Sequence, residues 1–83
     1  MTTRSEALAL LAKCLTSILG KPFHEGTLDA RAELADLGID SARSLELVGA
    51  LEEELASEFP NDRIERVRTV GDLLELIVGS PVR

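Results

Sequence analysis

The chain has 83 residues, which is the length of one small domain, so we expect a single domain over residues 1–83. Its formal net charge is −6, from 15 acidic and 9 basic residues. This charge argues against nucleic acid and against an anionic membrane surface, since both attract basic proteins. An acidic domain instead attracts basic patches on other proteins. We therefore expect a monomer with protein partners, no nucleic acid and no membrane.

The apolar residues favour helices over strands. They make up 45% of the chain, but only 2% is aromatic, so the core must be built from Leu, Ile, Val and Ala. Cys14 is the single cysteine and His24 the single histidine, which excludes an internal disulfide and a multi-cysteine or histidine metal site. With neither a signal-peptide run nor a membrane span in the sequence, we expect a cytoplasmic protein.

The first predicted helix runs from about Ser5 to Leu19, because apolar residues recur on one helical face. These residues are Leu8, Leu11, Leu15 and Ile18. Thr3 or Ser5 can cap its start, and Gly20 ends it. Residues 20–40 are too long for an ordinary helix connection, and their spread apolar side chains predict an ordered loop with a helical turn near Leu34.

The second predicted helix runs from about Ser41 to Ser57, with Asp40 as its N-cap. Its apolar stripe is Leu45, Leu47, Val48, Leu51 and Leu55. A short helical turn is expected at residues 62–66, and a last helix from about Val70 to Val78 that Thr69 and Asp72 begin as a capping box. The fold class is therefore all-α: a small helical bundle of three main helices plus one short helix, with a long loop between the first and second.

Catalysis by this chain alone is not expected. Cys14 reads as a small semi-buried hydrophobe, and His24 as a solvated loop residue without a partner for acid–base chemistry. Consecutive acids at residues 52–54 point in different directions on a helix and cannot all line one cleft. Ser41 is an exposed serine at a helix start, where a phosphate ester would lie near the positive end of the helix dipole. A lone serine there is usually only part of a cap.

A longer run around Ser41 resembles a known family. Residues 37–41 read Leu-Gly-Ile-Asp-Ser, residues 45–48 read Leu-Glu-Leu-Val, and residues 50–54 read Ala-Leu-Glu-Glu-Glu. This run resembles the acyl carrier proteins, in which a serine that follows Leu-Gly and Asp accepts 4′-phosphopantetheine from coenzyme A. The resemblance covers most of residues 34–77 and implies a carrier rather than an enzyme.

The resemblance implies a role for each of these residues. Ser41 would carry the phosphopantetheine arm, whose thiol holds acyl groups as thioesters, and Asp40 would help to position the serine for the phosphopantetheinyl transferase and its magnesium. The second helix would be read by the transferase and by acyl-loading, condensing and acyl-transfer enzymes, whose Arg and Lys side chains meet acids of this family. Those acids would be Glu46, Glu52 and Glu53, of which Glu46 and Glu53 share a face.

Other positions depart from the family pattern. Ala42 stands where a leucine is usual, Arg43 puts a positive charge on the partner surface beside the attachment site, and Gly49 replaces a larger residue. A basic cluster at Arg63, Arg66 and Arg68 follows the second helix. These departures favour a specialised, polyketide-type pathway over housekeeping fatty-acid synthesis.

Three other functions compete with an acyl carrier. A peptidyl or aminoacyl carrier shares the arm and the fold, although such carriers often have Gly-Gly-x-Ser before the helix. A helical interaction module that has lost the arm is a second, and a hydrolase that pairs Ser41 with His24 is a third. Some family members also bury the acyl chain, for which the lining would be Leu47, Leu51, Ile64, Val67 and Leu74; an ordinary packed core is the favoured interpretation of these five residues.

Overall fold

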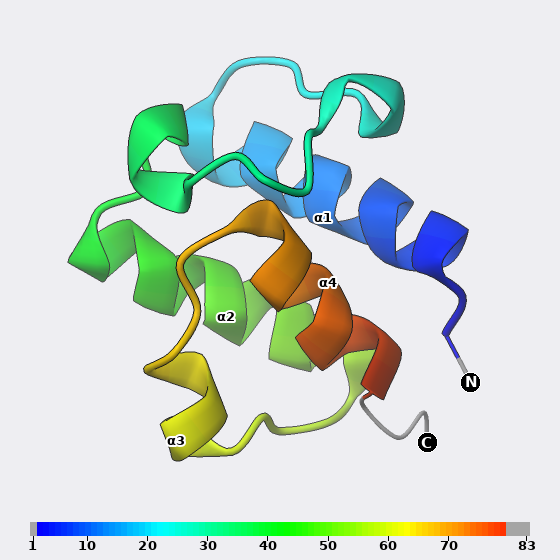
Figure 1. The fold of residues 1–83 in the computed structure, drawn as a ribbon, viewed down its shortest axis with the longest axis vertical. Helices are drawn as coiled ribbons and strands as arrows, with labels where there is room; N and C mark the ends of the chain where they lie inside the picture. The colour runs from blue at the N-terminus through cyan, green and yellow to red at the C-terminus, as the bar shows by residue number, and fades with distance from the viewer. Residues whose placement is uncertain (1, 80–83) are drawn as a thin grey trace.

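The computed structural model describes residues 2–79. Its elements, in chain order, are α1 (Arg4–Leu19), the 3-10 turns Glu25–Thr27 and Leu34–Leu37, α2 (Ser41–Leu55), α3 (Asn61–Ile64) and α4 (Val70–Gly79). The predicted all-α bundle of three main helices and one short helix is confirmed, as is the long loop between α1 and α2 (Figure 1). The turn expected near Leu34 is present, whereas the turn at Glu25–Thr27 was not predicted.

Helix α1 begins one residue before its predicted start because Thr3, rather than Ser5, is the N-cap. The Thr3 hydroxyl oxygen accepts a hydrogen bond from the Glu6 N–H at 3.1 Å. At the other end Gly20 adopts φ +69°, a left-handed conformation that favours glycine, and its N–H donates to the Thr16 carbonyl at 3.0 Å. At both ends of α1, backbone groups thus form hydrogen bonds with nearby residues, and the capping residues were predictable from the sequence.

The core lies where α1 packs against α2 and α4 (Figure 1). The largest side chains with almost no exposed surface are Leu11, Leu15, Leu47, Leu51, Val70, Leu73, Leu74 and Ile77. Burying each of these contributes roughly 1.5–3 kcal/mol relative to leaving it in water. Leu45 does not join this core: it is 69% exposed, so its assignment to the apolar stripe of the second helix is wrong.

Helix α2 ends at Leu55, two residues before the predicted Ser57, because the chain closes the helix with a left-handed residue. Ala56 has φ +51°, and the N–H of Ser57 donates to the Glu52 carbonyl at 3.1 Å. Alanine gives no sequence signal for this conformation, which usually belongs to glycine. The short helix α3 follows Pro60 directly and begins at Asn61, one residue earlier than expected.

Helix α4 begins with the predicted capping box, in which aspartate takes the place that usually belongs to glutamate. The Asp72 N–H donates to the Thr69 hydroxyl oxygen at 3.1 Å, and the Asp72 carboxylate accepts from the Thr69 N–H at 3.1 Å. Within residues 2–79, none of the helices combines the length and apolar character needed to cross a bilayer.

The long loop is fastened to the start of α4 by backbone hydrogen bonds. They run from the Gly71 N–H to the Ala30 carbonyl at 2.8 Å, from the Val70 N–H to the Ala32 carbonyl at 3.0 Å, and from the Leu34 N–H to the Arg68 carbonyl at 2.9 Å. A Cβ at Gly71 would lie 2.9 Å from the Ala30 carbonyl oxygen, so this close approach requires glycine. The loop that leads to α2 is therefore held at a fixed place beside α4.

Candidate functional site

Ser41 is the first residue of α2, and its side chain is exposed. Asp40 is the N-cap, as predicted: its backbone is extended, and its carboxylate oxygen Oδ1 accepts a hydrogen bond from the Arg43 N–H at 2.9 Å. The cap fixes the direction in which the helix starts and leaves the Ser41 hydroxyl at the surface, near the positive end of the helix dipole.

The residues before Ser41 form a tight turn that explains their sequence. The turn Leu34–Leu37 ends at Gly38, which has φ +95° and donates its N–H to the Ala35 carbonyl at 3.1 Å. Ile39 is only 4% exposed, and its N–H donates to the Leu34 carbonyl at 3.0 Å. A left-handed glycine followed by a buried isoleucine thus anchors the chain two residues before the serine.

An open groove of about 350 Å³ lies beside Ser41. It is lined by Glu33, Leu34, Ala35, Ile39, Asp40, Ser41, Ser44, Val67 and Arg68. Most of this lining comes from the residues that precede α2 and from the first turn of α2, and Val67 and Arg68 come from the segment between α3 and α4. The groove therefore combines an apolar lining, the Ser41 and Ser44 hydroxyls, and charges of both signs.

The structure separates the three acids predicted for partner binding. Glu46 and Glu53 are exposed on α2. Glu52 is half-buried, and its carboxylate accepts a hydrogen bond from the Phe59 N–H at 2.8 Å, which fixes the chain after α2. Arg43, in the first turn of α2, is exposed. An isolated sequence could not show the bond from Glu52 to Phe59, because it joins positions on either side of the left-handed Ala56.

The residues considered for an acyl pocket are part of the packed core. Leu47, Leu51 and Leu74 have at most 1% of their surface exposed, and Ile64 and Val67 are half-buried against the same cluster. Val67 also lines the groove at Ser41. This arrangement agrees with the favoured interpretation of these residues as an ordinary core.

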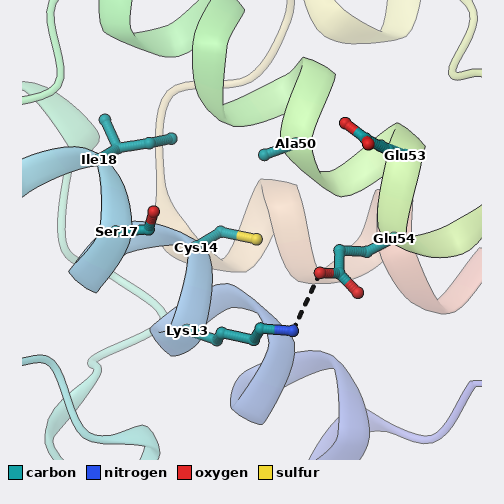
Figure 2. Close-up of a pocket in the computed structure, with 7 residues that line it drawn as sticks. All are labelled: Lys13, Cys14, Ser17, Ile18, Ala50, Glu53 and Glu54. Carbon is teal, nitrogen blue, oxygen red and sulfur yellow. Dashed lines mark hydrogen bonds and ion pairs between the residues drawn. The ribbon is translucent and has the colours of Figure 1, made fainter.

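A second cavity, of about 430 Å³, lies between α1 and α2 around Cys14 (Figure 2). Across it the Lys13 ammonium contacts the Glu54 carboxylate at 2.9 Å, an exposed ion pair that raises the pKa of Lys13. Cys14 is 5% exposed, and burial, with a further contribution from Glu54, raises the pKa of its thiol. The thiol is therefore a weak nucleophile at neutral pH, as expected for a cysteine that serves as a small hydrophobe.

His24 lies in the loop and is exposed. In the part of the chain that the structure describes, no group of three or more His, Cys, Asp or Glu side chains could hold a metal ion. Neither His24 nor Cys14 lines the groove at Ser41. The pairing of Ser41 with His24 that a hydrolase would need is therefore not seen in this groove.

Comparison with known proteins identifies the class to which this fold and site belong. Residues 9–77 match the family described as "Phosphopantetheine attachment site". The chain is 31% identical over 83 residues to an acyl carrier protein of Acidothermus cellulolyticus, an alignment that spans 96% of this chain and 94% of that protein. It is 42% identical over 53 residues to an acyl carrier protein of Rhodopseudomonas palustris, across 64% of this chain and 67% of that one.

The fold comparison agrees. The crystal structure of an acyl carrier protein from Thermotoga maritima superposes with a TM-score of 0.80 at 27% identity, and covers 90% of this chain and 86% of that one. The fold and the matched segment define a phosphopantetheine-attachment domain. The chain belongs to the acyl carrier protein family, whose members are non-catalytic carriers with a 4′-phosphopantetheine prosthetic group.

Proposed function

We propose that Ser41 carries the 4′-phosphopantetheine arm and that the protein presents acyl groups, as thioesters on this arm, to the enzymes of a dedicated pathway. The observation that carries the proposal is the position of Ser41: an exposed hydroxyl on the first residue of α2, behind the Asp40 cap and inside the matched segment. Residues 1–83 would act as one carrier domain, and its buried, unpaired Cys14 suits a reducing cytosol.

The residues around Ser41 fit an arm attached there. The hydroxyl oxygen is exposed and forms the ester bond to phosphorus, while its proton passes to a base of the phosphopantetheinyl transferase and the adenosine bisphosphate part of coenzyme A leaves. Asp40 has one carboxylate oxygen held by the Arg43 N–H, which keeps the carboxylate at the helix start, where the transferase and its magnesium would approach. When bound, the arm supplies the thiol that forms the thioester.

We propose that partner enzymes read the exposed face of α2. Glu46 and Glu53 are exposed seven residues apart, about two helical turns, so they present carboxylates along one face. Leu45, at 69% exposure, adds an apolar contact close to Ser41. Contacts between such acids and the basic side chains of a partner are exposed and weakened by salt, which suits a carrier that must exchange partners quickly.

The pathway that we favour is a specialised, polyketide-type one. Ala42 and Gly49 are exposed, so at these two positions the surface of α2 carries little or no side chain. Arg43, two residues after Ser41, and Arg68, which lines the groove at Ser41, add positive charge there, and Arg63 and Arg66 are exposed as well. Partners adapted to this surface would need acidic as well as basic groups, which distinguishes them from partners of a uniformly acidic carrier.

Intact-protein mass spectrometry tests the proposal. The protein is incubated with coenzyme A, magnesium and a broad-specificity phosphopantetheinyl transferase, and we expect the mass of one phosphopantetheine to be added. The loaded carrier is then offered malonyl and aminoacyl donors with their loading enzymes, and we expect acyl rather than aminoacyl transfer. A folded protein that gains no mass would instead be an interaction module with the carrier fold.

A further inference from the structure

Arg68 is the one cationic side chain among the described residues that line the groove at Ser41. Two carboxylates, those of Glu33 and Asp40, line the same groove. Ser41 and Ser44 contribute hydroxyls, and the rest of the lining is apolar. An anion attached to Ser41 would meet two negative charges in this groove, so its placement depends on the positive charge that faces them.

The backbone of Arg68 is held from both sides. Its N–H donates to the Asp72 carboxylate at 2.9 Å, and its carbonyl accepts from the Leu34 N–H at 2.9 Å. The Leu34 carbonyl in turn accepts from the Ile39 N–H at 3.0 Å, two residues before Ser41. A continuous series of hydrogen bonds therefore fixes the backbone of Arg68 relative to Ser41. An arginine in a free loop would have no such fixed position.

The guanidinium of Arg68 has no carboxylate within ion-pair distance among the side chains that the structure describes. Asp72 accepts the backbone N–H groups of Arg68 and Thr69, and the Arg68 charge makes a smaller contribution to lowering the pKa of its carboxyl. Arg68 is exposed, so its side chain can turn towards the groove. The planar fork of a guanidinium binds two oxygens of one phosphate, a geometry that a lysine ammonium cannot reproduce.

We propose that Arg68 binds the phosphodiester that joins the arm to Ser41 and so positions the first part of the arm along the groove. This inference rests on the proposed function of Ser41. The protein carries a net charge of −6, and the phosphodiester adds one further negative charge at the start of an acidic helix. Arg68 offsets that charge where it arises, while Leu34, Ile39 and Val67 provide the apolar lining along which the arm would continue.

The first readout is the NMR signal of the Arg68 Nε–Hε group in the wild-type protein before and after loading. Loading should move this signal and slow its exchange with water, whereas the corresponding signal of Arg63, which does not line the groove, should stay in place. Millimolar inorganic phosphate added to the unloaded protein should not reproduce the shift, because the proposed contact depends on tethering to Ser41. Saturation of the shift by free phosphate would mean a general anion site and would overturn the assignment to the arm.

The second readout compares loaded Arg68→Gln, Arg68→Lys and the matched control Arg63→Gln by phosphorus NMR. We expect a narrower phosphodiester line for Arg68→Gln than for wild type, an intermediate line for Arg68→Lys, and no change for Arg63→Gln. Equal widths of the phosphodiester line in all four proteins would overturn the proposal.

Loading is measured by mass first, which separates the two hypotheses. A wild-type protein that gains no phosphopantetheine contradicts the function proposed for Ser41, whereas a loaded wild type with an unmoved Arg68 signal contradicts only the role of Arg68. If Arg68→Gln is not loaded, the wild-type signal still decides the question.

Discussion

Two hollows of similar size lie along α2, and they differ in how accessible their nucleophilic side chain is. The groove at Ser41 has a volume of about 350 Å³ and an exposed hydroxyl on the first residue of a helix. The cavity at Cys14 has a volume of about 430 Å³ and a buried thiol whose pKa is raised. The thiol, which is intrinsically the better nucleophile, thus lies in the larger hollow but is buried, whereas the hydroxyl is exposed to solvent.

The comparison teaches that the site proposed at Ser41 is distinguished by the accessibility of the reacting atom rather than by the volume of the cavity. Cys14 and its neighbours, drawn in Figure 2, belong to the contact between α1 and α2 and support the bundle. Ser41 belongs to a helix start that the preceding turn holds in place. The predictions below test this contrast from the largest expected effect to the smallest.

Replacing Ser41 should remove loading completely and leave the fold intact. Ser41→Ala loses the only atom that the arm would be attached to, whereas Asp40 and the Arg43 N–H, which cap the helix, are retained. Intact mass and circular dichroism report the two properties. Ser44→Ala is the matched control, because Ser44 also lines the groove, and it should still be loaded. Loading of Ser41→Ala would place the arm elsewhere and remove the contrast between the two hollows.

The Cys14 thiol should react slowly in the native protein. Its 5% exposure and raised pKa predict alkylation by iodoacetamide at neutral pH at least about 10-fold slower than in the urea-unfolded chain. The rate is followed by mass spectrometry. Equal rates in the folded and unfolded protein would show that the Cys14 cavity opens freely and that the two hollows are less different than their structures indicate.

Gly71→Ala should destabilise the protein by about 1–3 kcal/mol, because the new Cβ would lie 2.9 Å from the Ala30 carbonyl oxygen at the junction that holds the loop to α4. Gly49→Ala is the opposite control: space around Gly49 is open, so the alanine should stabilise α2 by up to about 1 kcal/mol. Urea unfolding of both variants measures the difference. An unchanged free energy of unfolding for Gly71→Ala would contradict a fixed junction between the loop and α4.

Reversing charge at Glu46 should slow the transfer of phosphopantetheine to the protein by about 3–10-fold at low salt, because basic groups on the transferase lose an attractive partner. Glu75→Lys makes the same change of charge on the exposed side of α4 and should have a smaller effect. The difference should shrink as salt is added. Equal effects of the two substitutions would indicate that only net charge matters and that α2 is not specifically read.

Asp72→Asn should reduce stability at neutral pH but not at low pH. Hydrogen bonds from the N–H groups of Arg68 and Thr69 lower the pKa of the Asp72 carboxyl. A lowered carboxyl pKa stabilises the fold above the unfolded-chain value of about 3.9, and this contribution is lost as pH falls through the folded value. We expect a cost of roughly 0.5–1 kcal/mol at neutral pH. Unfolding curves at both pH values check this, and an equal cost at each would contradict the assignment.

The local parts of the fold were predictable from the sequence. Thr3, Asp40 and the pair Thr69 and Asp72 are side chains that begin helices, and Gly20 ends one; each acts within four residues of its own position. The position of Ser41 at a helix start was predicted in the same way, but its role was inferred from the resemblance of the longer run around it to the acyl carrier proteins. Short-range signals of this kind survive in a single sequence because their physical cause is also local.

The missed features depend on contacts between distant residues. The exposure of Leu45 follows from how α2 is turned against α1, which helical periodicity does not fix when apolar residues occupy two sides. The contact between Lys13 and Glu54 joins positions 41 residues apart. The groove at Ser41 is lined in part by Val67 and Arg68, which lie far from Ser41 in the sequence. The spacing of residues 37–48 does not predict that these two residues lie there.

The most direct test of the central claim is to locate the arm by peptide mass spectrometry after loading and tryptic digestion. Cleavage after Arg31 and Arg43 yields the peptide of residues 32–43, whose single hydroxyl side chain is Ser41, and places Ser44 in the next peptide. We predict that phosphopantetheine is found on the peptide of residues 32–43 alone. Its presence on the peptide that contains Ser44, or on neither peptide of a folded protein, would contradict the account.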